Sequence, residues 1–241
     1  MHACPLEVPA DPLLDEREAK FLPDTAAAHA FWTVALHHLH PQRSAAPFVY
    51  ARTTYFDTPD LSYYRSSGRR LRLREYAAAR QADERPVVAD RCYLEVKQSA
   101  AGRRTKTRVA LCAEEVAAAL GALADAPLTP CVATCYRRRA LVDDTGSIRV
   151  TLDEHILLCR PTLLGSAFAS QGSADVLAHG PPFVLEYKAW VASPPWLVRA
   201  LAELEEAVGF SKFLLGMDAI GRLTPGRGVD RDLLWVNSCS G

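Results

Sequence analysis

The chain has 241 residues, 49% of them hydrophobic and 23% charged, which is typical of a globular protein with a substantial core. Its 28 basic and 28 acidic side chains cancel, so total charge gives no general attraction for nucleic acid or an anionic membrane. No apolar run reaches the roughly 18 residues of a membrane span, and no secretion signal is recognisable. Seven cysteines without framework spacing indicate reduced thiols and a cytoplasmic location.

The hydrophobic pattern predicts many short strands and few helices. Residues 1–14 are proline-rich and predict an extended lead-in, and residues 222–241 predict a tail. The elements predicted between them, in chain order, are a strand over 15–22, a helix from 24 or 25 to 39, strands over 48–56, 69–76, 92–98 and 103–111, a helix over 114–124, a hairpin of strands over 134–142 and 147–158, a strand over 183–190, and an amphipathic helix over 194–208 that Gly209 would end. This succession favours an antiparallel barrel or sandwich.

Charged residues occupy every second position of six segments in these strands, with Thr151 as the one exception. The segments are Glu16-x-Glu18-x-Lys20, Arg70-x-Arg72-x-Arg74, Glu95-x-Lys97, Arg104-x-Lys106-x-Arg108, Arg149-x-Thr151-x-Asp153 and Glu186-x-Lys188. Because side chains alternate between the two faces of a strand, the charges of each segment share one face. The intervening residues are largely apolar. Each strand is therefore predicted to have one apolar face and one ionic face.

The ionic faces have two interpretations. Alternation commonly means that one face of an antiparallel sheet contacts water. Against this, Arg70, Arg72 and Arg74 would repel one another at about 7 Å, without an acid in their own segment to compensate. Single acids beside bases, as in Glu186 and Lys188, also suit a metal-bound phosphate chain. If a barrel turned these faces inward, it would form a charged tunnel, and the pattern alone leaves both interpretations open.

Other phosphate-handling signatures are absent from the sequence. It contains no GxxxxGK[ST] loop, no GxGxxG following a strand, no GxSxG elbow and no kinase-like HRD or DFG set. Basic residues interspersed with Tyr63, Tyr64 and Tyr76 leave RNA binding as an alternative. The zero net charge and the interleaved carboxylates argue against it.

Several motifs resemble known families. Glu16-Arg17-Glu18-Ala19-Lys20 resembles the ExExK signature of the CYTH, or triphosphate tunnel metalloenzyme, superfamily. The blocks that resemble the catalytic domain of the vacuolar transporter chaperone (VTC) complex, the polyphosphate polymerase branch, are TTYFDTPDLSYY (53–64), RLRLREY (70–76), YLEVKQ (93–98), TKTR (105–108), CYRRRAL (135–141), IRVTLDE (148–154), LEYKAW (185–190) and FSKFLLGM (210–217). They follow the family order from about residue 15 to 221.

The resemblance implies an α+β fold in which residues 15–221 form an eight-stranded antiparallel tunnel with a few flanking helices. The tunnel would bind triphosphate together with Mn²⁺ or Mg²⁺. The implied phosphate-binding residues, with Arg108, Arg149 and Lys188 added from the charge pattern, are Lys20, Arg72, Arg74, Lys97, Lys106, Arg108, Arg138, Arg149, Lys188 and Lys212. The implied metal ligands are Glu186, as the principal one, and Glu16, Glu18, Glu95 and Asp153.

The implied reaction is transfer of the γ-phosphoryl group of ATP to a growing inorganic polyphosphate chain, with Lys212, Arg72, Arg74, Arg138 and Glu186 as catalytic residues. Neither nucleic acid nor a membrane span is expected, and the oligomeric state is not predicted. Polymerase members often lack a complete ExExK motif, so its presence leaves open a metal-dependent triphosphatase. A non-catalytic polyphosphate-binding module is a third alternative.

Lys212 and two further arginines, Arg137 and Arg139, have interpretations of their own. Lys212 is either a solvated cation beyond the end of a helix or a phosphate ligand anchored by Phe210 and Phe213. Arg137 and Arg139 alternate with Arg138 and should lie on the opposite face of their strand.

Overall fold

The computed structural model describes residues 17–42, 48–66, 68–79, 89, 91–100, 103–112, 115–123, 127–161 and 176–223. Its strands are β1 (Arg17–Phe21), β2 (His40–Pro41), β3 (Phe48–Asp57), β4 (Arg69–Ala79), β5 (Arg91–Ala100), β6 (Arg103–Leu111), β7 (Thr129–Val142), β8 (Ile148–Cys159), β9 (Val176–His179) and β10 (Phe183–Ala189). Its helices are α1 (Thr25–Leu36), α2 (Ser62–Ser66), α3 (Val116–Leu123), α4 (Pro195–Ala202) and α5 (Lys212–Leu223). None of the described helices is long and apolar enough to cross a membrane.

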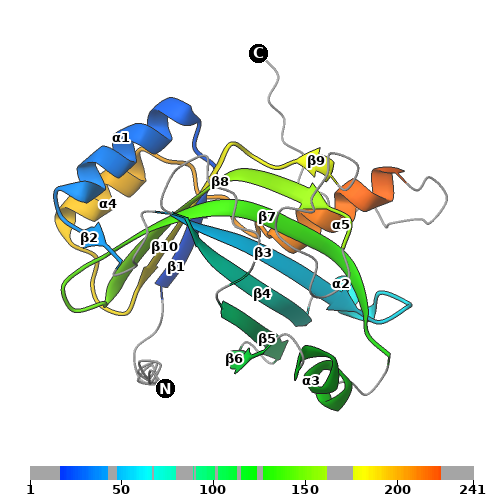
Figure 1. The fold of residues 1–241 in the computed structure, drawn as a ribbon. Coiled ribbons are helices and arrows are strands. Elements are labelled where there is room, and N and C mark those ends of the chain that lie inside the picture. Colours follow the sequence, from blue (N-terminus) through cyan, green and yellow to red (C-terminus); the bar gives the residue numbers. More distant parts are fainter. Residues whose placement is uncertain are drawn as a thin grey trace.

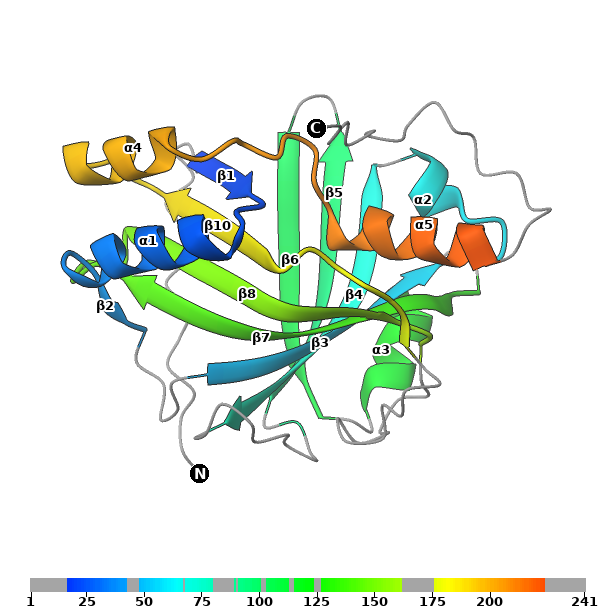
Figure 2. The same ribbon diagram turned by 90° about the horizontal axis from the view of Figure 1, so that it is seen from above.

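One curled antiparallel sheet dominates the structure (Figures 1 and 2). Its strands follow the order β1-β10-β8-β7-β3-β4-β5-β6, while β2 adds to β7 and β9 adds to β8. This confirms the predicted antiparallel fold with a few flanking helices. The path ends at β1 and β6, and among the described residues no backbone pairing joins these two strands. The sheet is therefore a half-barrel.

The apolar residues of the alternating segments lie on the convex face of the sheet. Leu152 and Leu185 pack there with Phe31 and Trp32 of α1 and with Leu197 of α4. Full burial of each such side chain contributes about 1.5–3 kcal/mol. A second convex cluster joins β4 and β5 to α3, and its buried members are Phe56, Leu71, Leu73, Leu94 and Val116. Because the apolar positions face outward to these helices, the charged positions face the concave side.

The first and fourth helices differ in how well the sequence predicted them. Asp24 caps α1, and its side chain accepts a hydrogen bond from the backbone N–H of Ala27 at 2.8 Å, as expected for this residue type. The predicted helix over 194–208 is too long, because α4 ends at Ala202. Beyond it, the backbone N–H of Ala207 donates to the carbonyl of Lys20 at 2.7 Å. Pairing with the edge of β1 thus takes this segment out of the helix.

Helix α5 was not predicted, and it packs against the concave face. Phe213 and Met217 form a buried cluster with Tyr55 of β3 and Val132 of β7. A Cβ atom on Gly216 would lie 2.7 Å from Cγ2 of Val132, so the helix can approach this closely only with glycine there. Lys212 is the first residue of α5. Its interpretation as a cation beyond a helix that Gly209 ends is therefore wrong.

Candidate functional site

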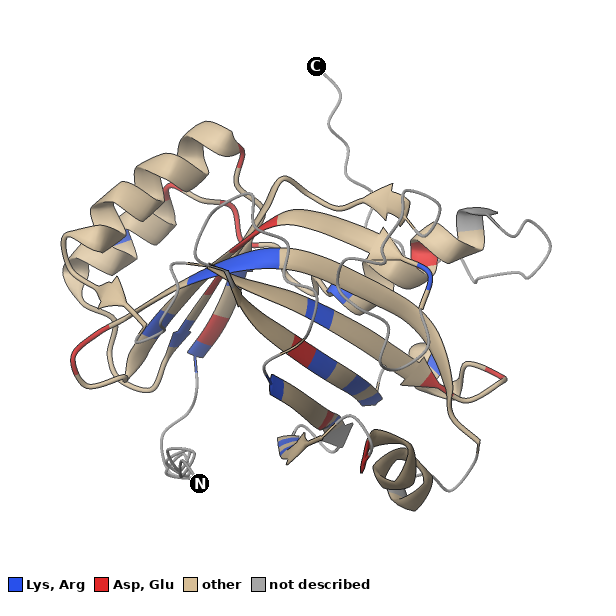
Figure 3. Ribbon diagram, viewed as in Figure 1, with Lys and Arg blue, Asp and Glu red and all other residues tan. Residues whose placement is uncertain are grey.

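Strand register gathers the charged residues on the concave face. Arg138 of β7 lies opposite Asp153 of β8, and Arg72 of β4 lies opposite Glu95 of β5. The same face carries Lys188 opposite both Glu18 and Arg149, and Lys97 opposite Lys106. Figure 3 shows basic and acidic residues interleaved along these strands. Of the two interpretations of the ionic faces, the structure supports the inward one.

One group of charges, here called the cationic wall, consists of Arg72, Arg74, Glu95, Lys106 and Arg108 on β4, β5 and β6. Glu95 is fully buried, and its two oxygens lie 2.5 Å from Nη2 of Arg72 and 2.5 Å from Nη2 of Arg108. Nζ of Lys106 is 3.4 Å away and Nη1 of Arg74 is 3.9 Å away. Burial alone would raise the pKa of Glu95, but the charges of Arg72 and Arg74 hold it well below its usual range.

The cationic wall resolves the repulsion expected from the sequence. Arg72 and Arg74 have no acid in their own alternating segment, so a compensating anion seemed necessary. The neighbouring strand supplies it, because Glu95 lies directly opposite Arg72 and accepts from its Nε at 2.6 Å. The arginines are thus held in a fixed arrangement before any ligand arrives.

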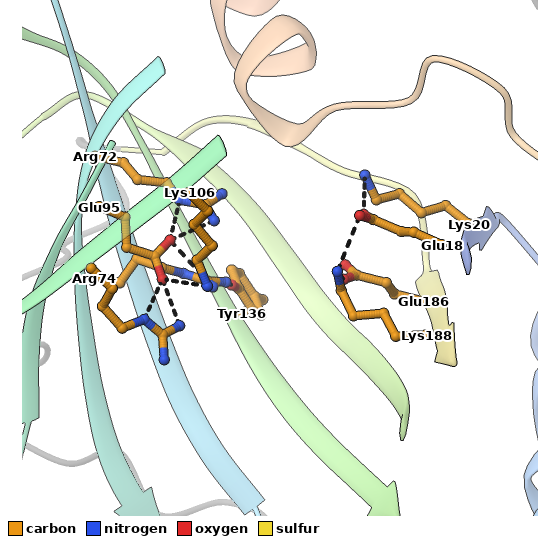
Figure 4. A network of polar contacts seen from close by, with 10 residues as sticks. Glu18, Lys20, Arg72, Arg74, Glu95, Lys106, Tyr136, Glu186 and Lys188 are labelled. Atoms are coloured by element: carbon orange, nitrogen blue, oxygen red, sulfur yellow. Dashed lines mark hydrogen bonds and ion pairs between the residues drawn. The ribbon is translucent and has the colours of Figure 1, made fainter. Parts of the chain in front are cut away.

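A second group, here called the lysine–glutamate wall, consists of Glu18 and Lys20 on β1 with Glu186 and Lys188 on β10. Nζ of Lys188 lies 3.1 Å from Glu18 and 3.8 Å from Glu186, and Nζ of Lys20 lies 3.3 Å from Glu18. Figure 4 shows this wall facing the cationic wall, with the charged ends of the two groups pointing toward each other. The side chains of this wall are partly exposed, by 19% for Glu186.

Both glutamates of the lysine–glutamate wall are ionised. Burial would raise the pKa of Glu186, but the positive charges of Arg138 and Lys188 lower it far more. Burial and the negative charge of Glu186 would likewise raise the pKa of Glu18, yet Lys188 and Lys20 bring it below its ordinary value. Two negatively charged carboxylates therefore stand side by side on this wall.

Between the walls, Asp153 binds two of the predicted phosphate ligands. Nε of Arg138 lies 2.5 Å from Oδ1 of Asp153, and Nζ of Lys212 lies 2.6 Å from its Oδ2. Tyr136 completes this centre, because its hydroxyl accepts from Nη2 of Arg74 at 2.7 Å and Nζ of Lys212 lies 4.7 Å from its ring centroid. Sequence reasoning missed Tyr136. Its place two positions before Arg138, on the same strand face, was the available signal.

Two predicted phosphate ligands stand apart from the others, since neither Arg149 nor Lys97 forms an ion pair with any described residue. The Nε atom of Arg149 is buried and has no hydrogen-bond partner there. Burial and the charge of Arg138 lower the pKa of Arg149. Burial and the charge of Arg72 lower the pKa of Lys97 to about 8. Both shifts mean that burial and neighbouring cations disfavour the charged forms, which an added anion would stabilise.

The predicted metal ligands fall into different surroundings. Glu16 lies outside the described residues. Arginine and lysine already occupy both oxygens of Glu95 and of Asp153. No cluster of three or more His, Cys, Asp or Glu suited to a metal occurs among the residues that the structure describes. Glu18 contacts lysines at the longer distances of 3.1 Å and 3.3 Å, and Oε2 of Glu186 has no ion-pair partner among the described residues. These two ionised carboxylates therefore fit best a hard divalent cation that also takes phosphate oxygens as ligands.

The convex face holds the residues expected there. Arg137 and Arg139 both contact Glu154, at 2.8 Å and 3.5 Å, on the face opposite Arg138, as predicted. Arg139 also lies over the ring of Trp32, with 4.9 Å between its Cζ and the ring centroid. These arginines therefore belong to the outer packing of the sheet rather than to the site.

A family model described as the VTC domain matches residues 15–127 and 121–220. The chain belongs to the VTC domain family. This confirms the resemblance that the motifs indicated, over nearly the same range. A search of curated proteins gave no significant match to this VTC domain.

Solved structures of low sequence identity are similar to this VTC domain. PH1819 from Pyrococcus horikoshii OT3 gives a TM-score of 0.52 at 13% identity, covering 85% of this chain and 99% of that one. HpAC1 from Hippeastrum, described as having a dominant triphosphatase activity, gives 0.45 at 17% identity, with coverages of 85% and 96%. PH1012 from P. horikoshii OT3 gives 0.43 at 14% identity, with coverages of 79% and 94%. The PH1819 comparison shows a likeness of fold alone.

Proposed function

We propose that this VTC domain is a polyphosphate polymerase, which transfers the γ-phosphoryl group of ATP to the end of an inorganic polyphosphate chain on its concave face. The observation that carries the proposal is the convergence of arginine and lysine from opposite walls on this face. Arg149 and Lys97, which form no ion pair with a described residue, make the need for an anionic ligand clearest. A linear polyphosphate supplies several negative charges along one line.

The arginines suit phosphate oxygens in geometry as well as charge. A guanidinium group is planar and donates two parallel hydrogen bonds, which matches the oxygens of a phosphoryl group. Arg72 and Arg74 lie on β4, and Arg138 reaches the same space from β7. Because Glu95 and Asp153 already hold these side chains in place, binding would cost little additional side-chain entropy.

Transfer would break the bond between the γ-phosphorus and the oxygen that bridges it to the β-phosphorus. A terminal oxygen of the polyphosphate would form the new bond to that phosphorus, and ADP would leave. Arg72, Arg74 and Arg138 would stabilise the equatorial oxygens, while Lys20 and Lys212 would hold the reacting groups in line. The attacking oxygen is already ionised, so no general base is required.

The carboxylates of Glu18 and Glu186 would hold the divalent metal, Mg²⁺ or Mn²⁺. When bound, such a cation would neutralise charge on the phosphate oxygens. Lys20 and Lys188, which contact Glu18, would keep these carboxylates oriented toward the concave face.

A triphosphatase is the second candidate. Glu18 and Lys20, the part of the ExExK motif within the described residues, form an ion pair at 3.3 Å on the lysine–glutamate wall. A complete motif of this kind is less common among polymerase members of the family. With water in place of the polyphosphate end, the same groups would support hydrolysis.

The test is to incubate the purified protein with ATP and Mn²⁺ or Mg²⁺ and to resolve the products by chain length. A ladder of long polyphosphate together with ADP supports the polymerase. Orthophosphate without a ladder supports the triphosphatase, and intact ATP contradicts both enzymes. Arg138→Ala should abolish product formation, whereas Arg137→Ala, on the opposite face of the same strand, is the matched control and should retain it.

A further inference from the structure

Thr151 of β8 has a buried side chain whose hydroxyl lacks a partner. The residue is 4% exposed, and its Oγ1 atom forms no hydrogen bond with any of the described residues. A buried hydroxyl that has lost its bonds to water destabilises a folded protein unless another group replaces them, and native proteins leave few such atoms. The hydroxyl of Thr151 therefore indicates a ligand that binds beside it.

Strand register places Thr151 next to the candidate metal ligand. Thr151 lies directly opposite Glu186 of β10, so both side chains project from the concave face. Directly opposed residues of antiparallel strands have Cβ atoms about 4.5–5.5 Å apart, which is within reach of one bound ion. On its other side Thr151 lies opposite Ala140 of β7, whose methyl group offers no hydrogen bond. The polar neighbour of Thr151 across the strands is therefore Glu186.

The charge of Glu186 decides which kind of ligand fits this position. The cations Arg138 and Lys188 keep Glu186 ionised, so its negative charge opposes a phosphate oxygen placed directly against Thr151 and attracts a cation to the same place. Oε2 of Glu186 has no ion-pair partner among the described residues, and the hydroxyl of Thr151 forms no hydrogen bond with it. Both oxygens are therefore open to one divalent cation.

We propose that Thr151 supplies an uncharged oxygen to the divalent cation held by Glu18 and Glu186. Mg²⁺ and Mn²⁺ prefer oxygen ligands, and a Ser or Thr hydroxyl holds Mg²⁺ in the P-loop NTPases. A neutral ligand suits this wall, because a third carboxylate would add negative charge where phosphate must approach. This inference rests on the proposed metal site, and it adds Thr151 as a residue that positions the cation.

The test uses Mn²⁺ alone as the probe, titrated by the loss of the electron paramagnetic resonance signal of the free ion. Thr151→Val keeps the shape of the side chain and removes its hydroxyl, and it should weaken Mn²⁺ binding about tenfold. Thr151→Ser, which keeps a hydroxyl, should bind Mn²⁺ as the wild type does.

The matched control is Thr134→Val, which should leave the Mn²⁺ affinity unchanged. Thr134 of β7 is 0% exposed, and its hydroxyl also lacks a hydrogen-bond partner within the described part of the chain. The residues opposite it are Thr53 and Leu158, so no carboxylate faces it across the strands. The two threonines therefore differ in their cross-strand neighbours and share their burial.

Further measurements separate metal binding from other roles of Thr151. Inorganic triphosphate, titrated by calorimetry in the presence of EDTA, should bind Thr151→Val and the wild type equally. In a Glu186→Gln background, Thr151→Val should lose less Mn²⁺ affinity than in the wild type, because the two residues share one cation. Without metal, Thr151→Val should melt at or above the wild-type temperature, since the hydroxyl that it removes has no partner.

Unchanged Mn²⁺ affinity in Thr151→Val, or equal weakening in Thr134→Val, overturns the role of Thr151. Weaker binding of triphosphate without metal would make Thr151 a phosphate ligand and overturns it as well. Wild-type protein that binds no Mn²⁺ overturns this proposal together with the metal site. The proposed function is judged separately, because the products formed from ATP test it on the same wild-type protein.

Discussion

Two strands carry the same short motif in different surroundings: Glu95-x-Lys97 on β5 and Glu186-x-Lys188 on β10. Glu95 lies between strands that present arginine, and it is fully buried against Arg72 and Arg108. Glu186 is paired in register with Lys20 and Thr151, and its side chain is 19% exposed. Cross-strand neighbours, rather than the motif itself, determine what each carboxylate does.

The comparison separates a structural acid from a candidate ligand. Both oxygens of Glu95 accept hydrogen bonds from guanidinium groups, at 2.6 Å from Arg72 and 2.7 Å from Arg108. Glu186 contacts only Lys188 among the ion pairs of the described residues, at 3.8 Å, and stands beside the second carboxylate Glu18. Glu95 therefore arranges the cationic wall, while Glu186 has oxygens left for a ligand.

The largest expected effect is on turnover in Glu186→Gln. If Glu186 holds the metal, loss of its charge should lower kcat by about 10²–10³-fold. Binding of inorganic triphosphate without metal should persist, because the arginines are unchanged. Steady-state kinetics with calorimetry on the same variant would measure both effects. Unchanged turnover would contradict the metal assignment.

The next effect is on stability in Glu95→Gln. Removing one partner of a buried ion pair leaves the others uncompensated, so the free energy of unfolding should fall by about 3–5 kcal/mol. Urea denaturation would measure this loss, and added triphosphate should recover part of it by supplying negative charge to Arg72 and Arg108. A similar loss in Glu186→Gln would remove the distinction between the two glutamates.

The smallest effect concerns pH and Lys97. Its pKa is about 8 in the folded protein and 10.5 in the unfolded chain, so the unfolded chain binds more protons between these values. Lys97 should therefore make stability rise with pH from about 8 to 10.5. Triphosphate needs the charged amine, so affinity should fall above pH 8, by at most about tenfold per pH unit. Calorimetry from pH 7 to 10 would test this, and Lys97→Arg should give a flatter profile.

Much of the fold was predictable because alternation of apolar and charged residues marks most of the main strands, and aromatic and β-branched residues mark β3. Helix α5 was not predictable, because Gly216 within it lowers helix propensity. Glycine is needed there because the helix backbone lies close to Val132 on a strand far away in sequence. The end of α4 was also mispredicted, because the hydrogen bond from Ala207 to Lys20 joins segments far apart in sequence. Tertiary contacts of this kind leave no local signal.

The candidate site was likewise predicted only in part from the sequence. Charged residue types and their shared face followed from the sequence, as with Arg72 and Arg138. Which acid binds which base did not, because register between strands sets it, as for Asp153 with Lys212. Uncharged residues of the site, Tyr136 above all, were missed because a pattern of charged residues does not include them.

The pairing of β1 with β10 has a consequence for the order in which the site forms during synthesis. The cationic wall lies on consecutive antiparallel strands, which can pair early because their contacts are short in sequence. The lysine–glutamate wall joins Glu18 to Lys188, so it must wait until β10 has left the ribosome. Before β10 is made, the arginines of the nascent sheet could attract cellular RNA. Glu95 limits this because it already pairs with Arg72 and Arg108 as an internal counterion.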